Sequence, residues 1–199
     1  AMIIEPLVQG AGGMRMCRSQ FLAAVQALLH EYDVLAIYDE VMTGFGRTGE
    51  LFACLKANTQ PDIICLAKGL TGGFLPLAAT VCSDRVFAAF CGGADRAFYH
   101  RHSYTANPLG CTAALASLDL LAAEAFRPLA QWQREEIQRL KGHERLGRAR
   151  VCGTIAAVDV LVAGEEGYWH EIGPRLREGF LKRGILLRPL GNTVYVLPP

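Results

Sequence analysis

The sequence predicts an α/β protein, in which an open and mostly parallel sheet is followed by a smaller α+β unit. Three observations lead to this prediction. Short apolar runs alternate with stretches of helical periodicity, the runs are apolar on both faces, and the pattern changes to short strands after about residue 148. Parallel strands that helices cover are apolar on both faces, and this alternation is typical of βαβ units.

The first 125 residues are predicted to contain four strands and two long helices. The strands are expected at residues 2–5, 34–38, 63–66 and 77–81, with a glycine-rich loop at 9–13. Ser19 is a suitable N-cap for a helix that extends to about Tyr32 along an apolar stripe. Asn107 and Pro108 begin a second helix, because Asn caps well and Pro suits the first helical position.

The rest of the chain is predicted to form the smaller unit. An amphipathic helix is expected at 126–140, strands at 152–161 and 185–189, and a helix at 172–183 between them. Gly191 and Asn192 form a hairpin-type turn between the last two strands. We place the large domain at residues 1–135 and the small domain at 136–199.

The composition excludes several classes of protein. The 199 residues are 51% hydrophobic and 20% charged, with a formal net charge of +1. Disordered chains are less hydrophobic and more highly charged, and nucleic-acid-binding chains are more basic. Seven widely spaced cysteines without a C-x-x-C pair predict reduced, mostly buried thiols in a cytoplasmic protein. No apolar run reaches about 18 residues, so no membrane span is expected.

Residues 44–49 match the dinucleotide-binding pattern G-x-G-x-x-G letter for letter. That pattern binds a pyrophosphate only where its glycines form the turn between a strand and a helix N-terminus. Here five residues, among them Asp39 and Glu40, separate the predicted strand from Gly44, and no strong helical pattern follows Gly49. The two carboxylates would repel a pyrophosphate, so nicotinamide or flavin binding is not predicted.

A carboxylate and an amine follow neighbouring predicted strands. Asp39 ends the strand at 34–38 and Lys68 ends the strand at 63–66. Consecutive parallel strands end at the same crevice, where α/β proteins bind ligands. Apolar neighbours should bury Lys68 and make its amine a nucleophile toward carbonyls. Pyridoxal 5'-phosphate uses such a pair, but a helix-capping aspartate and an ordinary loop lysine fit the spacing equally well.

Several blocks then resemble the class III pyridoxal-phosphate aminotransferases. They are residues 34–49, Ala67-Lys68-Gly69 with Thr71-Gly-Gly73, and 103–108, in the family's order. Residues 5–16 resemble the biotin-synthesis branch of that family. The resemblance implies a fold-type-I transferase, a homodimer with a shared active site, and a chain that corresponds to the second half of a complete enzyme.

The resemblance also implies residue roles. Lys68 is the lysine that forms the Schiff base and carries the proton, and Asp39 pairs with the pyridinium nitrogen. Ser103, where the family usually has Thr, binds the phosphate from the neighbouring subunit, and His102 lines the same site. Arg101 stands where the branch has a glycine that touches substrate, which puts that contact in doubt. Arg188 binds the substrate carboxylate, a task that its planar fork suits.

The implied reaction converts 8-amino-7-oxononanoate to 7,8-diaminononanoate with S-adenosylmethionine as amino donor, although some relatives use lysine. Two alternatives stay open: a class III aminotransferase of ω-amino acids or diamines, and a non-catalytic association domain. The family's ring-stacking aromatic residue and phosphate-binding turn lie in its first half, so we expect this chain to be inactive alone.

Four further polar positions are considered for a role in the site. Glu5, after the first strand, is expected to be a structural acid near the cofactor. Arg47 should either border the substrate or pair with an acidic neighbour. His100 and His102 have strand-like metal spacing but no evident third ligand, so no metal site is predicted.

Overall fold

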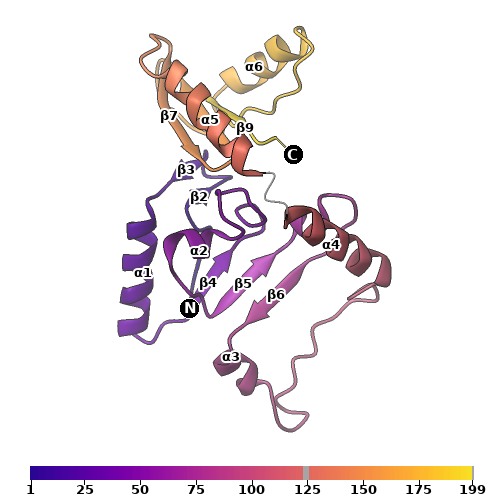
Figure 1. Ribbon diagram of the computed structural model, residues 1–199. Coiled ribbons are helices and arrows are strands. Elements are labelled where there is room, and N and C mark those ends of the chain that lie inside the picture. Colours follow the sequence, from indigo (N-terminus) through magenta and orange to yellow (C-terminus); the bar gives the residue numbers. More distant parts are fainter. Residues whose placement is uncertain (123–125, 199) are drawn as a thin grey trace.

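A four-stranded sheet forms the centre of the N-terminal part of the protein (Figure 1). The computed structural model describes residues 1–122 and 126–198. The strands are β1 (Met2–Ile4), β4 (Ala36–Asp39), β5 (Ile63–Leu66) and β6 (Ala79–Cys82), in that spatial order. β1, β4 and β5 are parallel, whereas β6 is antiparallel to β5. The predicted mostly parallel α/β sheet is confirmed.

Helices lie on both sides of this sheet in Figure 1, with α1 on one side and α4 on the other. They are α1 (Ser19–Glu31), α2 (Ala53–Ala57), α3 (Asp84–Ala89) and α4 (Pro108–Leu121), and a 3₁₀ turn, η1, covers Lys68–Thr71. The predicted start of α4 is confirmed, because the Asn107 side chain accepts a hydrogen bond from the Gly110 N–H at 2.7 Å. Its predicted extension to residue 125 lies partly outside the described residues.

The predicted cap of α1 is wrong by one position. Arg18 is the N-cap residue and Ser19 is already helical. The Ser19 hydroxyl is 3.3 Å from the Lys56 carbonyl, to which it donates. A contact with another segment therefore takes the hydroxyl that the sequence pattern assigned to capping.

A second sheet of three antiparallel strands forms the C-terminal part, in the order β7-β8-β9. Its elements are α5 (Phe126–Leu140), β7 (Leu146–Cys152), β8 (Ile155–Val160), α6 (Ile172–Leu181) and β9 (Thr193–Val196). The predicted strand at 152–161 is thus the end of β7, a turn, and β8. Residues 185–189, all of them described, form no strand. Pro189 has no N–H to donate to a ladder, which disfavours a paired strand there.

The predicted turn at Gly191 and Asn192 is present, but it joins a single bridging residue to β9. Leu190 and Thr193 exchange two backbone hydrogen bonds, of 2.9 and 3.0 Å, across it. Gly191 has φ +57°, the left-handed conformation that such turns require.

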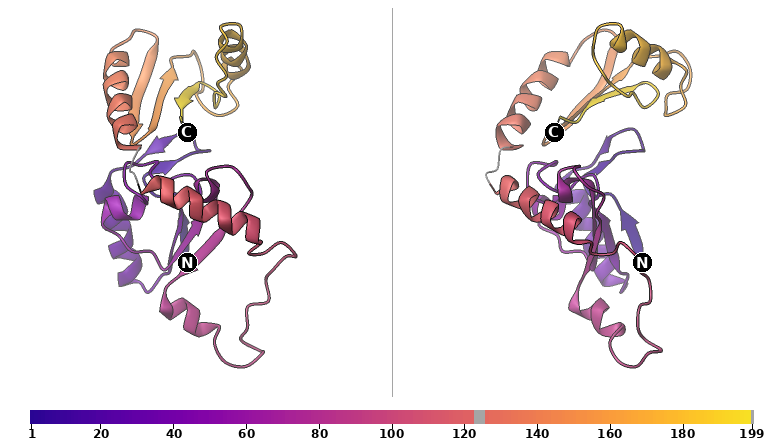
Figure 2. Two further views of the ribbon diagram at one scale, coloured as in Figure 1. Left: turned by 45° about the vertical axis from the view of Figure 1, so that its right-hand side comes forward. Right: turned by 90° about the vertical axis from the view of Figure 1, so that its right-hand side faces the viewer.

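Helix α5 packs against β7 and β8, as both views in Figure 2 show. Ala130 and Ile137 are among its buried residues, and they lie on either side of the predicted domain division between 135 and 136. That division would cut one packed helix in two. We propose instead that the domains divide between α4 and α5.

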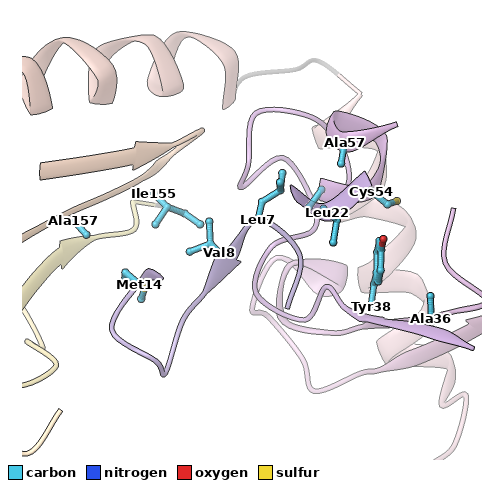
Figure 3. Close-up of a cluster of buried hydrophobic side chains, with 11 residues drawn as sticks. Leu7, Val8, Met14, Leu22, Ala36, Tyr38, Cys54, Ala57, Ile155 and Ala157 are labelled. Atoms are coloured by element: carbon cyan, nitrogen blue, oxygen red, sulfur yellow. The ribbon is translucent and has the colours of Figure 1, made fainter. Parts of the chain in front are cut away.

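The two parts share one apolar core (Figure 3). A short hairpin, β2 (Val8–Gln9) with β3 (Arg15–Met16), replaces the predicted loop and lies between them. Leu7, Val8 and Met14 pack in the same cluster as Ile155 and Ala157 of β8. The buried contact that joins the two parts is therefore made by residues about 145 positions apart in the sequence.

The cysteines and the helices bear on two further sequence expectations. All seven cysteines lie in the described part of the chain and are free thiols, but only Cys54 is buried, so the expectation of mostly buried thiols is wrong. Among residues 1–122 and 126–198 no single helix is long and apolar enough to cross a membrane. Helices α4 and α5 pass that test of length and composition only as a pair bent by 66°.

A buried carboxylate in the second sheet gives a pH-dependent prediction. The Asp159 side chain is 1% exposed. Burial alone would raise its pKa, but hydrogen bonds from Arg150, Thr193 and Arg148 outweigh that effect and hold the pKa below the ordinary value of 3.8. A carboxylate whose pKa is depressed on folding stabilises the fold above its unfolded pKa, and this contribution is lost as the pH falls.

We therefore expect Asp159→Asn to cost about 2 kcal/mol of unfolding free energy at neutral pH, the worth of charged hydrogen bonds. The difference from the wild type should shrink below about pH 4. Urea unfolding of the full-length protein between pH 3 and 7 measures it. A difference that stays constant over this range would contradict the assignment.

Candidate active site

A cavity of about 630 Å³ lies where the ends of the parallel strands meet the C-terminal part. Its lining residues come from the ends of β1, β4 and β5, from the segment after β4 as far as Arg47, and from the β2–β3 hairpin. Tyr168 and the segment from Arg188 to Leu197 complete it. Five charged residues line it, namely Glu5, Asp39, Arg47, Lys68 and Arg188. The predicted convergence of Asp39 and Lys68 on one crevice is therefore present.

Asp39 is the last residue of β4, paired with Cys65 in the parallel ladder. Its Oδ1 accepts a hydrogen bond from the Val41 N–H at 3.1 Å. This short turn fixes the carboxylate at the end of the strand while it lines the cavity. Glu5 is fixed in a similar way after β1, where its Oε2 accepts from the Gly10 N–H at 3.0 Å.

Glu40, the next residue after Asp39, forms hydrogen bonds within the fold and does not line the cavity. Its side chain is fully buried and accepts hydrogen bonds from the Ala53 and Cys54 N–H groups, at 2.7 and 2.9 Å, and from the Thr43 hydroxyl. Burial raises the pKa of Glu40, and these hydrogen bonds oppose that effect. A carboxylate therefore caps the helix that follows the G-x-G-x-x-G pattern, and sequence analysis did not predict this role.

The glycines of that pattern serve packing. A short helix, α2, does follow them, but its N-terminal N–H groups bind Glu40. A Cβ on Gly44 would lie 2.9 Å from the Glu40 carbonyl oxygen, and one on Gly46 would lie 2.6 Å from the Phe126 ring. The N-terminal N–H groups of α2 are therefore not free to bind a pyrophosphate.

Lys68 begins η1 directly after β5, with an unusual φ of +45°. Its side chain is exposed, and its ammonium has no hydrogen-bond partner among the described residues. The expectation that apolar neighbours bury Lys68 is wrong. The residue stands where three cavities meet, so open space rather than packed side chains surrounds it.

The glycine after Lys68 has a packing role. A Cβ on Gly69 would lie 2.8 Å from the Cβ of Phe45, so the backbone beside Lys68 lies against that ring. Phe45 also makes an edge-to-face contact with Phe52, at 5.4 Å between ring centroids. The 44–52 segment therefore packs against the backbone next to Lys68.

Two arginines line the cavity from different parts of the chain. Arg188 is exposed, and within the described residues its guanidinium forms no ion pair. Arg47 is half-buried, and burial lowers its pKa. It donates to the Pro198 carbonyl and forms no ion pair among the described residues, so the expected pairing with an acidic neighbour is not observed.

The segment before α4 lies apart from this cavity. Arg101, His102 and Ser103 are exposed in the long connection that extends from α3 to α4 (Figure 1). His102 lines a separate cavity of about 1110 Å³ that also includes Lys68, whereas the lining of neither cavity includes Arg101 or Ser103. Among the described residues, no three His, Cys, Asp or Glu side chains are arranged to hold a metal ion.

Sequence reasoning missed two aromatic residues of the main cavity. Tyr168 and Tyr195 line it from the loop before α6 and from β9. Neither lies in a motif, and only the packing of the C-terminal sheet brings them to the strand ends. No local sequence pattern could have identified them.

Comparison with known proteins decides the family. The whole chain, residues 1–199, matches the family model described as aminotransferase class-III. The chain belongs to the class III aminotransferase family. An adenosylmethionine-8-amino-7-oxononanoate aminotransferase from Synechococcus elongatus is 55% identical to this class III chain over 202 residues, and one from Geobacter sulfurreducens is 43% identical over 210.

Solved structures agree with this assignment. The crystal structure of the adenosylmethionine-8-amino-7-oxononanoate aminotransferase from Methanocaldococcus jannaschii matches 99% of the class III chain with a TM-score of 0.88 at 36% identity. An amine transaminase from an uncultivated Pseudomonas species, crystallised in its PLP-bound form, matches all of it with a TM-score of 0.89 at 31% identity. The chain covers 48% and 47% of these structures, and it spans about half the length of the curated relatives it matches.

Proposed function

We propose that the full-length protein is a pyridoxal-phosphate-dependent aminotransferase that converts 8-amino-7-oxononanoate to 7,8-diaminononanoate. S-adenosylmethionine is the proposed amino donor. One structural observation is central to this proposal: Asp39, Lys68 and Arg188 line a single cavity. The names of the relatives support the choice of substrates, because those at 55% and 43% identity are both adenosylmethionine-8-amino-7-oxononanoate aminotransferases.

The residues of this cavity suit pyridoxal 5'-phosphate. The cofactor needs a free amine and a fixed carboxylate. The structure offers the Lys68 ammonium, which has no hydrogen-bond partner in the described part of the chain, and the Asp39 carboxylate, which accepts from the Val41 N–H. When bound, the cofactor supplies an electron sink next to the amino carbon of the substrate. Lys68 would bind its aldehyde carbon and Asp39 its ring nitrogen.

The chain's own residues then perform three tasks. Lys68 would accept a proton at Nζ and return it, which is general acid–base catalysis. The negative charge of Asp39 keeps a facing nitrogen protonated. Arg188 lines the same cavity and forms no ion pair with the residues that the structure describes, so it can bind a substrate carboxylate through two parallel hydrogen bonds.

We also propose that the enzyme is a homodimer whose Ser103 and His102 complete the site of the neighbouring subunit. Residues 101–103 are exposed and do not line the cavity that contains Asp39, which supports this proposal. Arg101 would then face the substrate of the other subunit. The seven free thiols support the proposed cytoplasmic location, which is a reducing compartment.

The test uses the full-length protein and a matrix of donors and acceptors. S-adenosylmethionine, lysine and a diamine are each combined with 8-amino-7-oxononanoate and with a simple ω-keto acid, and the products are identified by mass spectrometry. We expect 7,8-diaminononanoate from the first pair. Turnover confined to the ω-keto acid would favour the second candidate, since an omega-transaminase from Thermomicrobium roseum also matches with a TM-score of 0.87.

Replacement of Arg188 by glutamine should separate binding of the carboxylate from chemistry. We expect kcat/KM for the carboxylate-bearing acceptor to fall roughly 10- to 100-fold, the value of a charge-assisted pair. A single turnover with a diamine as amino donor and no acceptor present, in which no substrate bears a carboxylate, should change little. An equal loss for both substrates would contradict the role proposed for Arg188.

A further inference from the structure

Arg150, on β7, has every donor of its guanidinium occupied. Nε donates to the Met14 carbonyl at 2.8 Å, and Nη1 donates to Asp159 Oδ2 and the Arg148 carbonyl at 3.0 and 2.6 Å. Nη2 donates to Asp159 Oδ1 and the Gly13 carbonyl at 2.9 and 2.7 Å. These five bonds use all five N–H groups of an arginine. One side chain thus links β7, β8 and the β2–β3 hairpin.

The hairpin that Arg150 holds forms one wall of the candidate active site. Gly10, Ala11 and Met14 line the cavity that contains Lys68. Gly13 and Met14 have φ values of +90° and +52°, so two consecutive residues occupy the left-handed region. For a non-glycine residue such as Met14 this conformation is strained and persists only where surrounding contacts impose it. Both carbonyls of this strained pair accept from Arg150.

The partner of Arg150 holds a second wall. The Thr193 hydroxyl donates to Asp159 Oδ1 at 2.7 Å, and Thr193 in turn exchanges backbone hydrogen bonds with Leu190. Leu190 lines the cavity, and Arg188 precedes it by two residues. The Arg150–Asp159 pair therefore connects the hairpin wall to the segment that bears the proposed carboxylate-binding arginine.

We propose that Arg150 is a positioning residue, which sets the spacing between the Gly10–Met14 wall and Arg188 and so the fit of the substrate carboxylate. This inference rests on the proposed aminotransferase function and deepens it. Arg150 is not among the residues that line the cavity with Lys68. Its effect passes through the backbone of the hairpin on one side and through Asp159 and Thr193 on the other.

A simpler explanation is that the hairpin stays in place by apolar packing alone. Val8 and Met14 pack with Ile155, as Figure 3 shows, and this contact does not involve Arg150. The two explanations differ in what a conservative replacement does. Arg150→Lys keeps the positive charge opposite Asp159. An ammonium group has only three N–H donors, however, and cannot make the five hydrogen bonds of the planar guanidinium. If apolar packing alone holds the hairpin, this change should be tolerated. If the guanidinium of Arg150 holds it, the hairpin should shift.

The experiment measures KM and kcat of the full-length holoenzyme for the carboxylate-bearing acceptor and for a diamine. For Arg150→Lys we expect KM for the acceptor to rise about tenfold, with kcat within about twofold and the diamine unaffected. Arg148→Gln is the matched control, because Arg148 also binds Asp159 but makes no contact with the hairpin carbonyls. Its kinetic constants should equal those of the wild type.

Two further variants keep the test decisive. Gly13→Ala strains the hairpin directly, in open space where the nearest atom to the new Cβ is Thr193 Oγ1 at 3.7 Å, and it should raise the same KM even if Arg150→Lys fails to fold. In an Arg188→Gln background, Arg150→Lys should have no further effect. An unchanged KM, or equal losses for acceptor and diamine, would refute this inference alone. An inactive wild type would refute the proposed function as well.

Discussion

Replacing Lys68 with alanine is expected to remove the transaminase activity of the full-length protein. The amine has two proposed tasks, holding the cofactor and moving the proton, and loss of the proton transfer alone costs roughly 10²- to 10⁴-fold in rate. The fold should not suffer, because the side chain is exposed and has no hydrogen-bond partner among residues 1–122 and 126–198. Such surface changes usually alter the free energy of unfolding by less than about 0.5 kcal/mol.

Turnover and cofactor absorbance should therefore change, while the unfolding midpoint of the protein without cofactor stays constant. Lys182→Ala is a matched control, because Lys182 is also exposed and follows the last residue of α6, where its ammonium pairs with Glu178. Lys68→Arg should be as inactive as the alanine variant, because a guanidinium stays protonated and is no nucleophile. An added small primary amine should restore part of the activity of Lys68→Ala. Full activity in either Lys68 variant would remove the proposed mechanism.

The candidate site was predictable from sequence where it depends on strand topology. Asp39 and Lys68 follow adjacent strands, and parallel pairing of β4 with β5 brings their ends to one edge whatever the rest of the chain does. The burial of Lys68 was not predictable in this way. It depends on which segments pack around η1, and apolar neighbours in sequence do not guarantee apolar neighbours in space.

The place of Arg188 depends on contacts that no local pattern encodes. It reaches the cavity because β8 pairs with β9 and because the β2–β3 hairpin packs on Ile155. The failed strand prediction at 185–189 has the same origin, since an apolar run is equally compatible with a segment that lines a cavity. From sequence alone, only the family resemblance connected Arg188 with Asp39 and Lys68.

Replacing Gly153 with alanine is expected to destabilise the protein more than any other single glycine change in the contact between its two parts. Gly153 lies in the turn between β7 and β8, with φ +59°. A Cβ there would be 2.3 Å from both the Arg47 carbonyl oxygen and the Thr48 carbonyl carbon, and 2.4 Å from the Gly49 nitrogen. All three are backbone atoms, so the clash can be relieved only if the whole turn moves away.

The cost has two parts that a matched variant separates. Gly142 has φ +80° but nothing within 4 Å of its Cβ position, so Gly142→Ala measures backbone strain alone, about 1 kcal/mol. Overpacking adds about 1–3 kcal/mol, so the unfolding free energy of Gly153→Ala should fall by about 2–4 kcal/mol. Urea unfolding of both full-length variants measures the difference.

The turn that Gly153 contacts also contains Arg47, which lines the candidate active-site cavity. The Thr154 N–H donates to the Arg47 carbonyl at 2.9 Å. Displacement of the turn should therefore lower activity together with stability. Equal losses in the Gly142 and Gly153 variants would show that the two parts of the protein do not depend on this close backbone contact. A larger loss for Gly153→Ala would show that the same contact that joins the sheets also shapes the site between them.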